Sequence, residues 1–213
     1  VVLAVIAAVG PASPAHAATD RFTIAYGDTI SDGVPGVGAG NLEAGGDTDA
    51  YTFDGSADDV VIVERLAGYA GTFRMTLTAP DGTPLVDEGL YVTRELTLPT
   101  SGTYELTISG GTPTDVGPYS FALWVTPPAE VFAIASGDIV GPGVPGPGAG
   151  EVETPGSVDV YELDGEAGET IVVDRLTGQT TEVRWRLEAP DGSVVFDSFL
   201  VDQSAQLPTT GRF

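Results

Sequence analysis

The sequence predicts an all-β protein built of antiparallel strands, and two observations support that prediction. Glycine and proline account for 29 and 16 of the 213 residues and recur too often for a sustained helical period. Short runs rich in Val, Ile, Thr, Tyr and Phe alternate with turn residues at close spacing, which is typical of antiparallel strands.

In chain order, the runs that predict strands in the first half are 22–25, 49–53, 60–66, 72–78, 84–87, 91–98, 103–109 and 119–126. Alternation assigns their faces. Phe73, Met75 and Leu77 share one parity and Arg74 and Thr76 the other, so the apolar set faces a core. By the same alternation, these residues also face a core: Tyr104, Leu106, Ile108, Tyr119, Phe121, Leu123 and Val125. Strands of this number and length fit a two-sheet sandwich.

Short segments of the first half of the chain return in the second half at a constant sequence separation, which is the separation between Asp28 and Asp138. The repeated unit is therefore a whole domain. The segments Gly27-Asp28, 33–40, Asp49-Ala50-Tyr51, Arg65-Leu66 and Pro80-Asp81-Gly82 return as Gly137-Asp138, 143–150, Asp159-Val160-Tyr161, Arg175-Leu176 and Pro190-Asp191-Gly192. Both Pro-Asp-Gly segments predict hairpin-type turns, in which glycine supplies the positive φ.

This repeat predicts two tandem domains, residues 22–127 and 131–213, joined by a linker at 128–130. The proline pair at this junction, Pro127-Pro128, favours an extended and semi-rigid spacer. The segment 98–104 returns as 207–213, whereas residues 105–127 have no counterpart. We therefore expect a truncated second copy that lacks its last two strands and leaves Val183, Trp185 and Leu187 with part of their cover missing.

Residues 1–17 predict the remainder of a secretory signal peptide. Residues 1–9 form an apolar run too short to span a membrane, and Ala15-His16-Ala17 has the A-x-A pattern of a cleavage site. We expect a secreted or cell-surface protein that is not inserted in a membrane once this segment is removed.

Composition excludes several kinds of catalysis. Cysteine is absent, and His16, the one histidine, lies in the segment expected to be removed. Hydrolases that need a histidine base, zinc sites built on His or Cys, and disulfides are therefore excluded. An acidic chain offers many carboxylate pairs of the glycosidase type, but no pair stands out. We predict a protein that is not an enzyme and has no catalytic residues.

The charge balance constrains the partners. The net charge is −23, and all eight basic residues are arginine, so nucleic acids and anionic membranes are poor partners. Two interpretations of the acidity stay open, a solvated exterior or a supply of oxygen ligands for hard cations. The segments 33–46 and 141–156 are rich in Gly and Pro but lack the spacing of phosphate-binding loops, so we expect surface loops there.

The order of several motifs carries a family resemblance. In the first copy they are Asp49-Ala50-Tyr51-Thr52-Phe53, Phe73-Arg74-Met75-Thr76-Leu77, Leu98-Pro99 with Gly102-Thr103-Tyr104, and Gly117-Pro118-Tyr119-Ser120-Phe121. In the second they are Asp159-Val160-Tyr161, Trp185-Arg186-Leu187, Pro190-Asp191-Gly192 and Leu207-Pro208 with Gly211. Together they resemble the bacterial pre-peptidase C-terminal domain. The resemblance implies tandem jelly-roll-like antiparallel β-sandwiches that are themselves non-catalytic and are usually appended to secreted proteases and other exported proteins.

The collagen-binding domains of clostridial collagenases look like distant members of that family, and some bind calcium through acidic residues just before the Asp-x-Tyr strand. By this resemblance the candidate calcium ligands are Asp47, Asp49 and Asp159. Ser157 stands where Asp47 would be repeated. The family's calcium ligands also come from a linker upstream of the domain, and here the linker before Phe22 offers Asp20 alone. The alternative role for Asp49 and Asp159 is structural, a hydrogen bond to a turn amide.

Trp124 is the candidate binding residue. It follows Leu123 on the opposite parity, so its ring is predicted to point away from the core. Two interpretations stay open: the ring stacks on a sugar or peptide, or it packs between the two domains. Trp185 lies on the core-facing parity and is predicted to pack.

These observations predict a secreted, non-catalytic binding or spacer module that is appended to a larger exported or cell-surface protein and contacts extracellular polysaccharide or fibrous protein. Two weakly binding copies on one chain gain avidity for a repetitive target. The alternative is an accessory domain of a secreted peptidase that aids processing, secretion or substrate binding.

Overall fold

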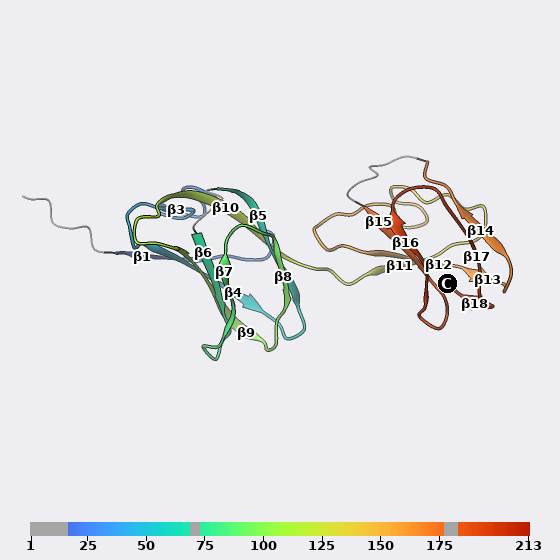
Figure 1. Ribbon diagram of the computed structural model, residues 1–213, viewed down its shortest axis with the longest axis horizontal. Coiled ribbons are helices and arrows are strands. Elements are labelled where there is room, and N and C mark those ends of the chain that lie inside the picture. The colour runs from blue at the N-terminus through green and yellow to red at the C-terminus, as the bar shows by residue number, and fades with distance from the viewer. Residues whose placement is uncertain (1–16, 69–72, 177–182) are drawn as a thin grey trace, which may run out of the picture. The chain divides into compact units, whose positions relative to one another are not determined.

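The computed structural model describes residues 17–68, 73–176 and 183–213, and the regular structure there consists of strands (Figure 1). Residue contacts divide the chain into two compact units, Val1–Thr126 and Pro127–Phe213, called unit one and unit two below. The predicted all-β fold class is confirmed. No described segment is a helix long and apolar enough to cross a membrane. The predicted signal peptide, 1–17, lies outside the described residues except for Ala17.

Unit one is a sandwich of two sheets. One sheet has the order β1-β4-β9-β6-β7, and the other has the order β2-β10-β5-β8, with β3 also pairing with β10. The strands are β1 (Thr19–Thr23), β2 (Thr29–Ile30), β3 (Asn41–Leu42), β4 (Thr48–Gly55), β5 (Val60–Gly68), β6 (Phe73–Thr78), β7 (Pro84–Gly89), β8 (Arg94–Thr97), β9 (Gly102–Gly110) and β10 (Gly117–Val125). Neighbouring strands run antiparallel except for β1 and β4, which are parallel.

The period-two alternation read from the sequence explains which side chains form the core. In β6, Phe73, Met75 and Leu77 are buried and Arg74 is exposed, as predicted. Across the sheet, Met75 pairs with Ile108 of β9, so apolar residues of adjacent strands lie side by side on the inner face.

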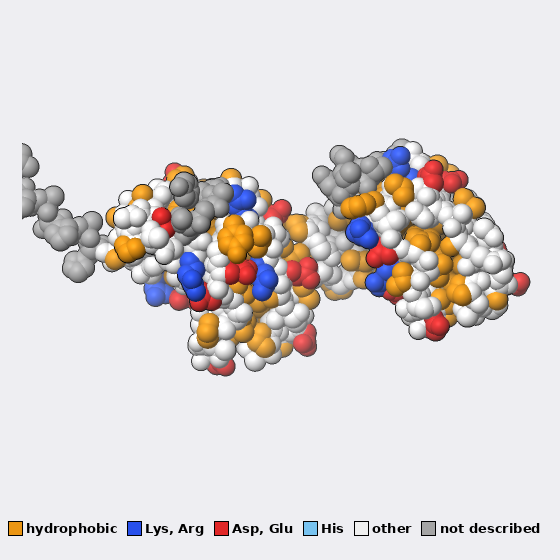
Figure 2. All heavy atoms as spheres, viewed as in Figure 1, with side chains coloured by type: hydrophobic (Ala, Val, Ile, Leu, Met, Phe, Trp, Pro, Cys, Tyr) orange, Lys and Arg blue, Asp and Glu red, His pale blue; other side chains and the backbone are white. Residues whose placement is uncertain are grey.

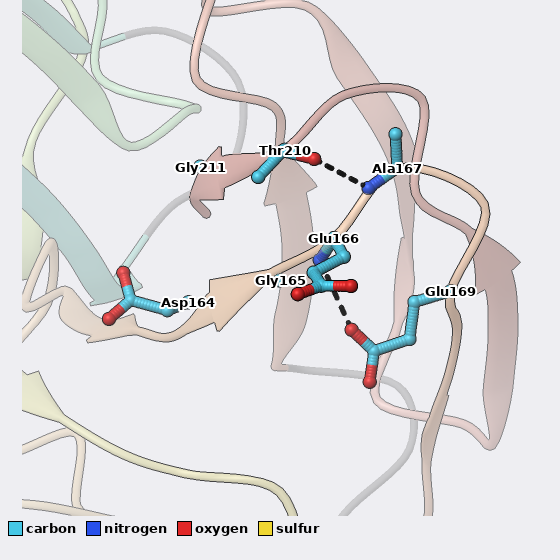
Figure 3. Close-up of a pocket in the computed structure, with 7 residues that line it drawn as sticks. All are labelled: Asp164, Gly165, Glu166, Ala167, Glu169, Thr210 and Gly211. Carbon is cyan, nitrogen blue, oxygen red and sulfur yellow. Dashed lines mark hydrogen bonds between the residues drawn. The ribbon is translucent and has the colours of Figure 1, made fainter.

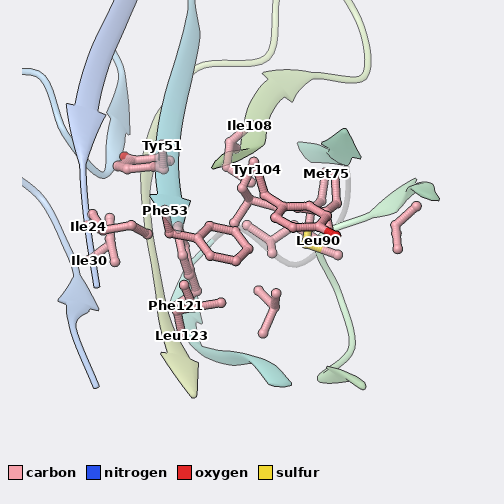
Figure 4. Close-up of a cluster of buried hydrophobic side chains, with 14 of the residues drawn as sticks. Ile24, Ile30, Tyr51, Phe53, Met75, Leu90, Tyr104, Ile108, Phe121 and Leu123 are labelled. Carbon is pink, nitrogen blue, oxygen red and sulfur yellow. The ribbon is translucent and has the colours of Figure 1, made fainter. Parts of the chain in front are cut away.

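Aromatic rings fill the centre of the unit-one core (Figure 4). Phe53 stacks on Tyr104 with ring centroids 5.6 Å apart, and Tyr51 meets Phe121 edge to face at 5.3 Å. All four rings are 1 % exposed or less. Burial of each such side chain contributes about 1.5–3 kcal/mol to the folded state of unit one.

Unit two is a set of paired strands whose pairings match part of unit one. They are β11 (Glu130–Ala133) with β12 (Asp159–Glu162), β13 (Asp164–Gly165) with β18 (Gly211–Arg212), β14 (Thr170–Val173) with β17 (Gln203–Gln206), and β15 (Arg184–Glu188) with β16 (Val194–Phe199). The β11–β12 pair is parallel and aligns Glu130 with Asp159, as β1 and β4 align Asp20 with Asp49.

Three features of unit one differ from the expected strands. The first strand begins at Thr19 and pairs in parallel, and two short strands, β2 and β3, were not predicted because two-residue strands show no alternation. The strand expected at 91–98 shortens to β8, because the chain turns at Leu90 and Tyr91, where the Tyr91 amide donates to the Gly89 carbonyl.

Candidate functional site

Asp47, the first candidate calcium ligand, caps two backbone amides. Its Oδ1 accepts from the amide of Ala18 at 2.9 Å, and its Oδ2 accepts from the amide of Ala44 at 2.7 Å. The residue is 8 % exposed, so both oxygens are committed to ordering the turn that leads into β4.

Asp49 lies deeper, at 1 % exposure, in a cluster of hydroxyl groups. Its Oδ2 accepts a short hydrogen bond from the Tyr119 hydroxyl and another, at 3.3 Å, from the Tyr51 hydroxyl. The two hydroxyls lie 2.7 Å apart. Burial raises the pKa of Asp49 to about 6, against the hydrogen bonds, which lower it. Burial also raises the pKa of both tyrosines.

Asp159 holds the matching place in unit two. Its Oδ2 accepts from the Tyr161 hydroxyl at 2.6 Å and from the Gly150 amide at 2.9 Å. Burial raises the pKa of Tyr161 to about 12. This Asp-Tyr pair is half-buried, whereas the pair formed by Asp49 and Tyr51 is fully buried.

The three candidate carboxylates are divided between the two units. Asp47 and Asp49 belong to unit one and Asp159 to unit two. Within the described ranges there is no group of three or more His, Cys, Asp or Glu side chains placed to hold a metal ion. Each of the three carboxylates bonds a backbone amide or a tyrosine hydroxyl, and calcium binding stays a prediction.

In each unit the aspartate and tyrosine, Asp49 with Tyr51 and Asp159 with Tyr161, anchor a loop rich in glycine. We call residues 31–40 and 141–150 the glycine loops of units one and two. The Gly40 amide donates to the Tyr51 hydroxyl at 2.9 Å, and the Gly150 amide donates to the Tyr161 hydroxyl at 2.8 Å. The anchor thus recurs at the same spacing in both units.

The backbone of each glycine loop is closed by its own hydrogen bonds. Ser31 and Val34 exchange amide-to-carbonyl bonds, and Gly141 and Val144 do the same. Both loops contain a cis Val-Pro peptide bond. Gly40 has φ of +69°, and a Cβ there would lie 2.2 Å from the Ser31 carbonyl carbon, so this position requires glycine.

A pair of stacked aromatic rings lies against each glycine loop. Phe22 stacks on Tyr51 with centroids 5.3 Å apart, and Phe132 stacks on Tyr161 at 5.5 Å, both at an interplanar angle of 24°. A Cβ on Gly36 would lie 3.4 Å from the Phe22 ring, so the loop rests directly on that ring. Both glycine loops are therefore held in one shape by the β-sheet beneath them.

The apolar residues of the glycine loops face solvent. In unit one, Val34 is 48 % exposed and Val37 is 97 % exposed. In unit two, Val144 is 53 % exposed, and Pro147, the counterpart of Val37, is also exposed. A fixed loop that exposes two apolar side chains would lose little conformational freedom if those side chains were covered.

Trp124 lies in β10 on the parity predicted to point away from the core, and its ring is half-buried. Its indole Nε1 donates to Glu64 Oε2 at 2.8 Å, across the β10–β5 pair. The ring is therefore fixed on the outer face of its own sheet. Both interpretations of Trp124, ligand stacking and packing between domains, stay predictions.

A depression in unit two gathers three acidic side chains (Figure 3). Its volume is about 680 Å³, and its lining includes Asp164, Glu166 and Glu169. Glu169 accepts from the Glu166 amide, and Thr210 accepts from the Ala167 amide. Unit one makes the same two turn bonds with Asp59 and Ser101 as the acceptors. The polar groups of this depression therefore order a turn.

Sequence reasoning missed three residues of these hydrogen-bond networks, Tyr119, Gly40 and Gly150. Tyr119 was assigned to the core by parity, but its contact with Asp49 joins residues 70 positions apart, and no local pattern reveals such a pair. Gly40 and Gly150 were assigned to surface loops. The signal that could have identified them is the repeat itself, which places each glycine 11 residues before the tyrosine that anchors it.

Comparisons with known proteins identify several solved structures that are similar to about half of this chain. No family model matches this sequence, and no curated protein matches it. The pre-peptidase C-terminal domain of a collagenase from Bacillus anthracis is 17 % identical, with a TM-score of 0.39 over 52 % of this chain and 99 % of that one. PliG from Aeromonas hydrophila, a periplasmic inhibitor of g-type lysozyme, is 14 % identical, with a TM-score of 0.39 over 50 % of this chain and 98 % of that one. The domain type that the sequence motifs resemble is thus among the solved structures similar to this chain.

Proposed function

We propose that this protein is a secreted, non-catalytic binding or spacer module that contacts an extracellular polysaccharide or fibrous protein through its two glycine loops. The observation that carries the proposal is their repetition. Each unit presents a loop of one shape, anchored by an Asp-Tyr pair and exposing two apolar side chains.

The apolar tips suit a target with exposed nonpolar surface, such as the faces of sugar rings or the side chains of a fibrous protein. Val37 is almost fully solvated, so burying it against a ligand removes apolar area from water. Two such contacts on one chain raise the affinity for a target that repeats, because the second contact forms at a high effective concentration.

Retention on insoluble targets tests the proposal. The full chain is passed over immobilised collagen, cellulose, chitin and peptidoglycan, and the test variant carries V34S, V37S, V144S and P147S. We expect the unaltered chain to be retained on at least one target and the variant to elute early. A variant that carries V34S and V37S alone should be retained less strongly than the unaltered chain but longer than the four-residue variant, because the glycine loop of unit two is unchanged.

The matched control carries V116S and V194S, which change two exposed valines outside the glycine loops. This control should be retained like the unaltered chain. Equal retention of the four-residue variant and the unaltered chain would refute the role of the loops. Retention on collagen alone would favour the accessory role beside a secreted peptidase.

A further inference from the structure

The β6–β7 hairpin of unit one carries an exposed aromatic ring beside an ion pair on its outer face. Arg74 pairs in register with Gly89, and a Cβ on Gly89 would lie 2.1 Å from Cε1 of Tyr91. The edge of the Tyr91 ring therefore fills the space of a side chain at residue 89, next to Arg74, and Tyr91 is 58 % exposed. Arg74 donates from Nε and Nη2 to Asp87, and the Thr76 hydroxyl donates to Asp87 at 3.2 Å.

The β15–β16 hairpin of unit two presents the same groups. Arg184, the counterpart of Arg74, donates from Nη2 to Asp197 Oδ1 at 2.7 Å. The guanidinium carbon of Arg184 lies 5.0 Å from the centre of the Phe199 ring, and Phe199 is 45 % exposed. Phe199 pairs in register with Arg184, at the position that Gly89 holds in unit one. An aromatic ring and an Arg-Asp pair therefore recur together.

The ring lies at a matching place in both hairpins but belongs to different positions of the repeat. The turn after the hairpin is the same in both units, since the Tyr91 amide donates to the Gly89 carbonyl at 2.9 Å and the Val201 amide donates to the Phe199 carbonyl at 2.7 Å. Figure 2 shows basic and acidic side chains beside hydrophobic ones over β6 and β7 and again over β15 and β16. Stability does not explain this recurrence, because exposed ion pairs contribute little to it.

Small side chains and a second ion pair cover the middle of the outer face of the same unit-one sheet. Thr76 of β6 lies beside Thr107 of β9, whose neighbour on the other side is Ala50 of β4. Glu105 of β9 is paired with Arg21 of β1 at 2.6 Å. Neighbouring charges on this face therefore cancel, although the net charge of the chain is −23. Such a face favours a ligand that is polar and uncharged.

The ring and the ion pair match two parts of a sugar. One face of a sugar ring presents C–H groups, which pack against an aromatic ring. Hydroxyl groups on adjacent carbons each donate and accept hydrogen bonds, and a guanidinium beside a carboxylate supplies donors and acceptors side by side. Among the contacts of the described residues, Arg74 commits Nε and Nη2 to Asp87, which leaves its Nη1 group for a ligand.

We propose that the outer faces of the β6–β7 and β15–β16 hairpins bind a neutral polysaccharide, with a sugar ring packed against Tyr91 or Phe199 and its adjacent hydroxyls bonded to the neighbouring Arg-Asp pair. The net charge of −23 disfavours an anionic polymer. Both hairpins lie outside the glycine loops, so the inference does not depend on what those loops bind.

The probes are four neutral oligosaccharides, cellohexaose, N-acetylchitohexaose, xylohexaose and maltohexaose, titrated separately into the full chain by isothermal calorimetry. We expect at least one to bind, with equal affinity at low and high salt, because the ligand carries no charge to be screened. Backbone amide shifts in the NMR spectrum of the unaltered chain should then concentrate in β6, β7, β15 and β16.

Paired substitutions test the ring and the carboxylate separately. Y91A with F199A removes two exposed rings, so the fold is retained, and we expect at least tenfold weaker sugar binding. Y91F with F199Y keeps both rings and should bind like the unaltered chain. D87N with D197N replaces each charged acceptor by a neutral amide and should weaken binding about fivefold.

The four-residue variant of the glycine loops separates this inference from the proposed function. It should bind the oligosaccharides like the unaltered chain. Loss of sugar binding in that variant, with full binding by Y91A with F199A, would overturn the hairpin sites and leave the glycine loops as the contact surface. The inference is also overturned if none of the four oligosaccharides binds. A triple-helical collagen peptide that shifts the amides of β6 and β15 when the sugars do not would overturn it as well.

Discussion

Asp49 combines almost complete burial with hydrogen bonds from two tyrosine hydroxyls, and burial is the stronger influence on its pKa. The folded-state pKa of about 6 lies above the unfolded value of about 3.9. The folded state therefore binds a proton more tightly than the unfolded chain does. The contribution of this group to stability is fully present below about pH 4 and is lost as the pH rises through 6.

Asp49→Asn removes that titration. A shift of about two pKa units corresponds to about 3 kcal/mol, so unaltered unit one should lose about that much unfolding free energy from this group between pH 4 and pH 7. The variant should lack this loss. Urea denaturation of both proteins between pH 4 and pH 7 measures the difference between their unfolding free energies. Other carboxylates contribute equally to both proteins and cancel in this difference, including Asp87, whose pKa is lowered by its hydrogen bond with Arg74. Parallel stability curves for the two proteins would contradict the assignment.

Gly40→Ala tests the shape of the glycine loop. The alanine would face both a left-handed backbone conformation and a contact of 2.2 Å with Ser31, so we expect a loss of about 2–3 kcal/mol in unfolding free energy. Gly82→Ala is the control, since Gly82 has φ of +86° but open space around it, and should cost about 1 kcal/mol. Thermal unfolding monitored by circular dichroism compares the two. Equal losses would show that backbone conformation alone sets the cost.

At the scale of strands, what could be predicted followed from alternation. In β6, β9 and β10 the apolar residues recur at every second position, and each strand appears where its pattern lies. The pattern carries no information on which strands pair. The parallel pairing of β1 with β4 and the two-residue strands β2 and β3 depend on contacts between distant residues. The contact of Tyr119 with Asp49 escaped prediction for the same reason.

The two units should differ in local stability. Unit one buries a continuous apolar core, whereas Val140 and Val152 of unit two are exposed. Among the described residues, β14 pairs with β17 alone and β15 pairs with β16 alone. We expect amides of β14 and β15 to exchange faster than those of β5 and β6. Hydrogen exchange followed by mass spectrometry measures this strand by strand. Equal protection of both sets would contradict the prediction.

For the whole molecule, the excess of 23 negative charges is the dominant electrostatic fact. The ion pairs of the described residues, such as Arg74 with Asp87 and Arg184 with Asp197, are largely exposed and contribute little. Repulsion among the remaining carboxylates opposes the compact state and is screened by salt.

We therefore expect the unfolding temperature to rise between 10 mM and 500 mM sodium chloride. A gain of about 1 kcal/mol in a unit of this size corresponds to about 4–8 °C. Differential scanning calorimetry at pH 7 measures it, and repeating the scan near the isoelectric point of about 4.1 is the control, where salt should have little effect. A fall in unfolding temperature with salt at pH 7 would show that the ion pairs outweigh the repulsion.

The chain has two tryptophans, one in each unit. Trp124 donates its indole N–H to Glu64 in unit one, and Trp185 meets the Phe196 ring edge to face in unit two. Each indole is half-buried and has its own polar and aromatic neighbours, so the emission spectrum of each depends on the integrity of a different half of the molecule. Two proteins, each with one tryptophan replaced by phenylalanine, would therefore give separate optical signals for the two units without any added label.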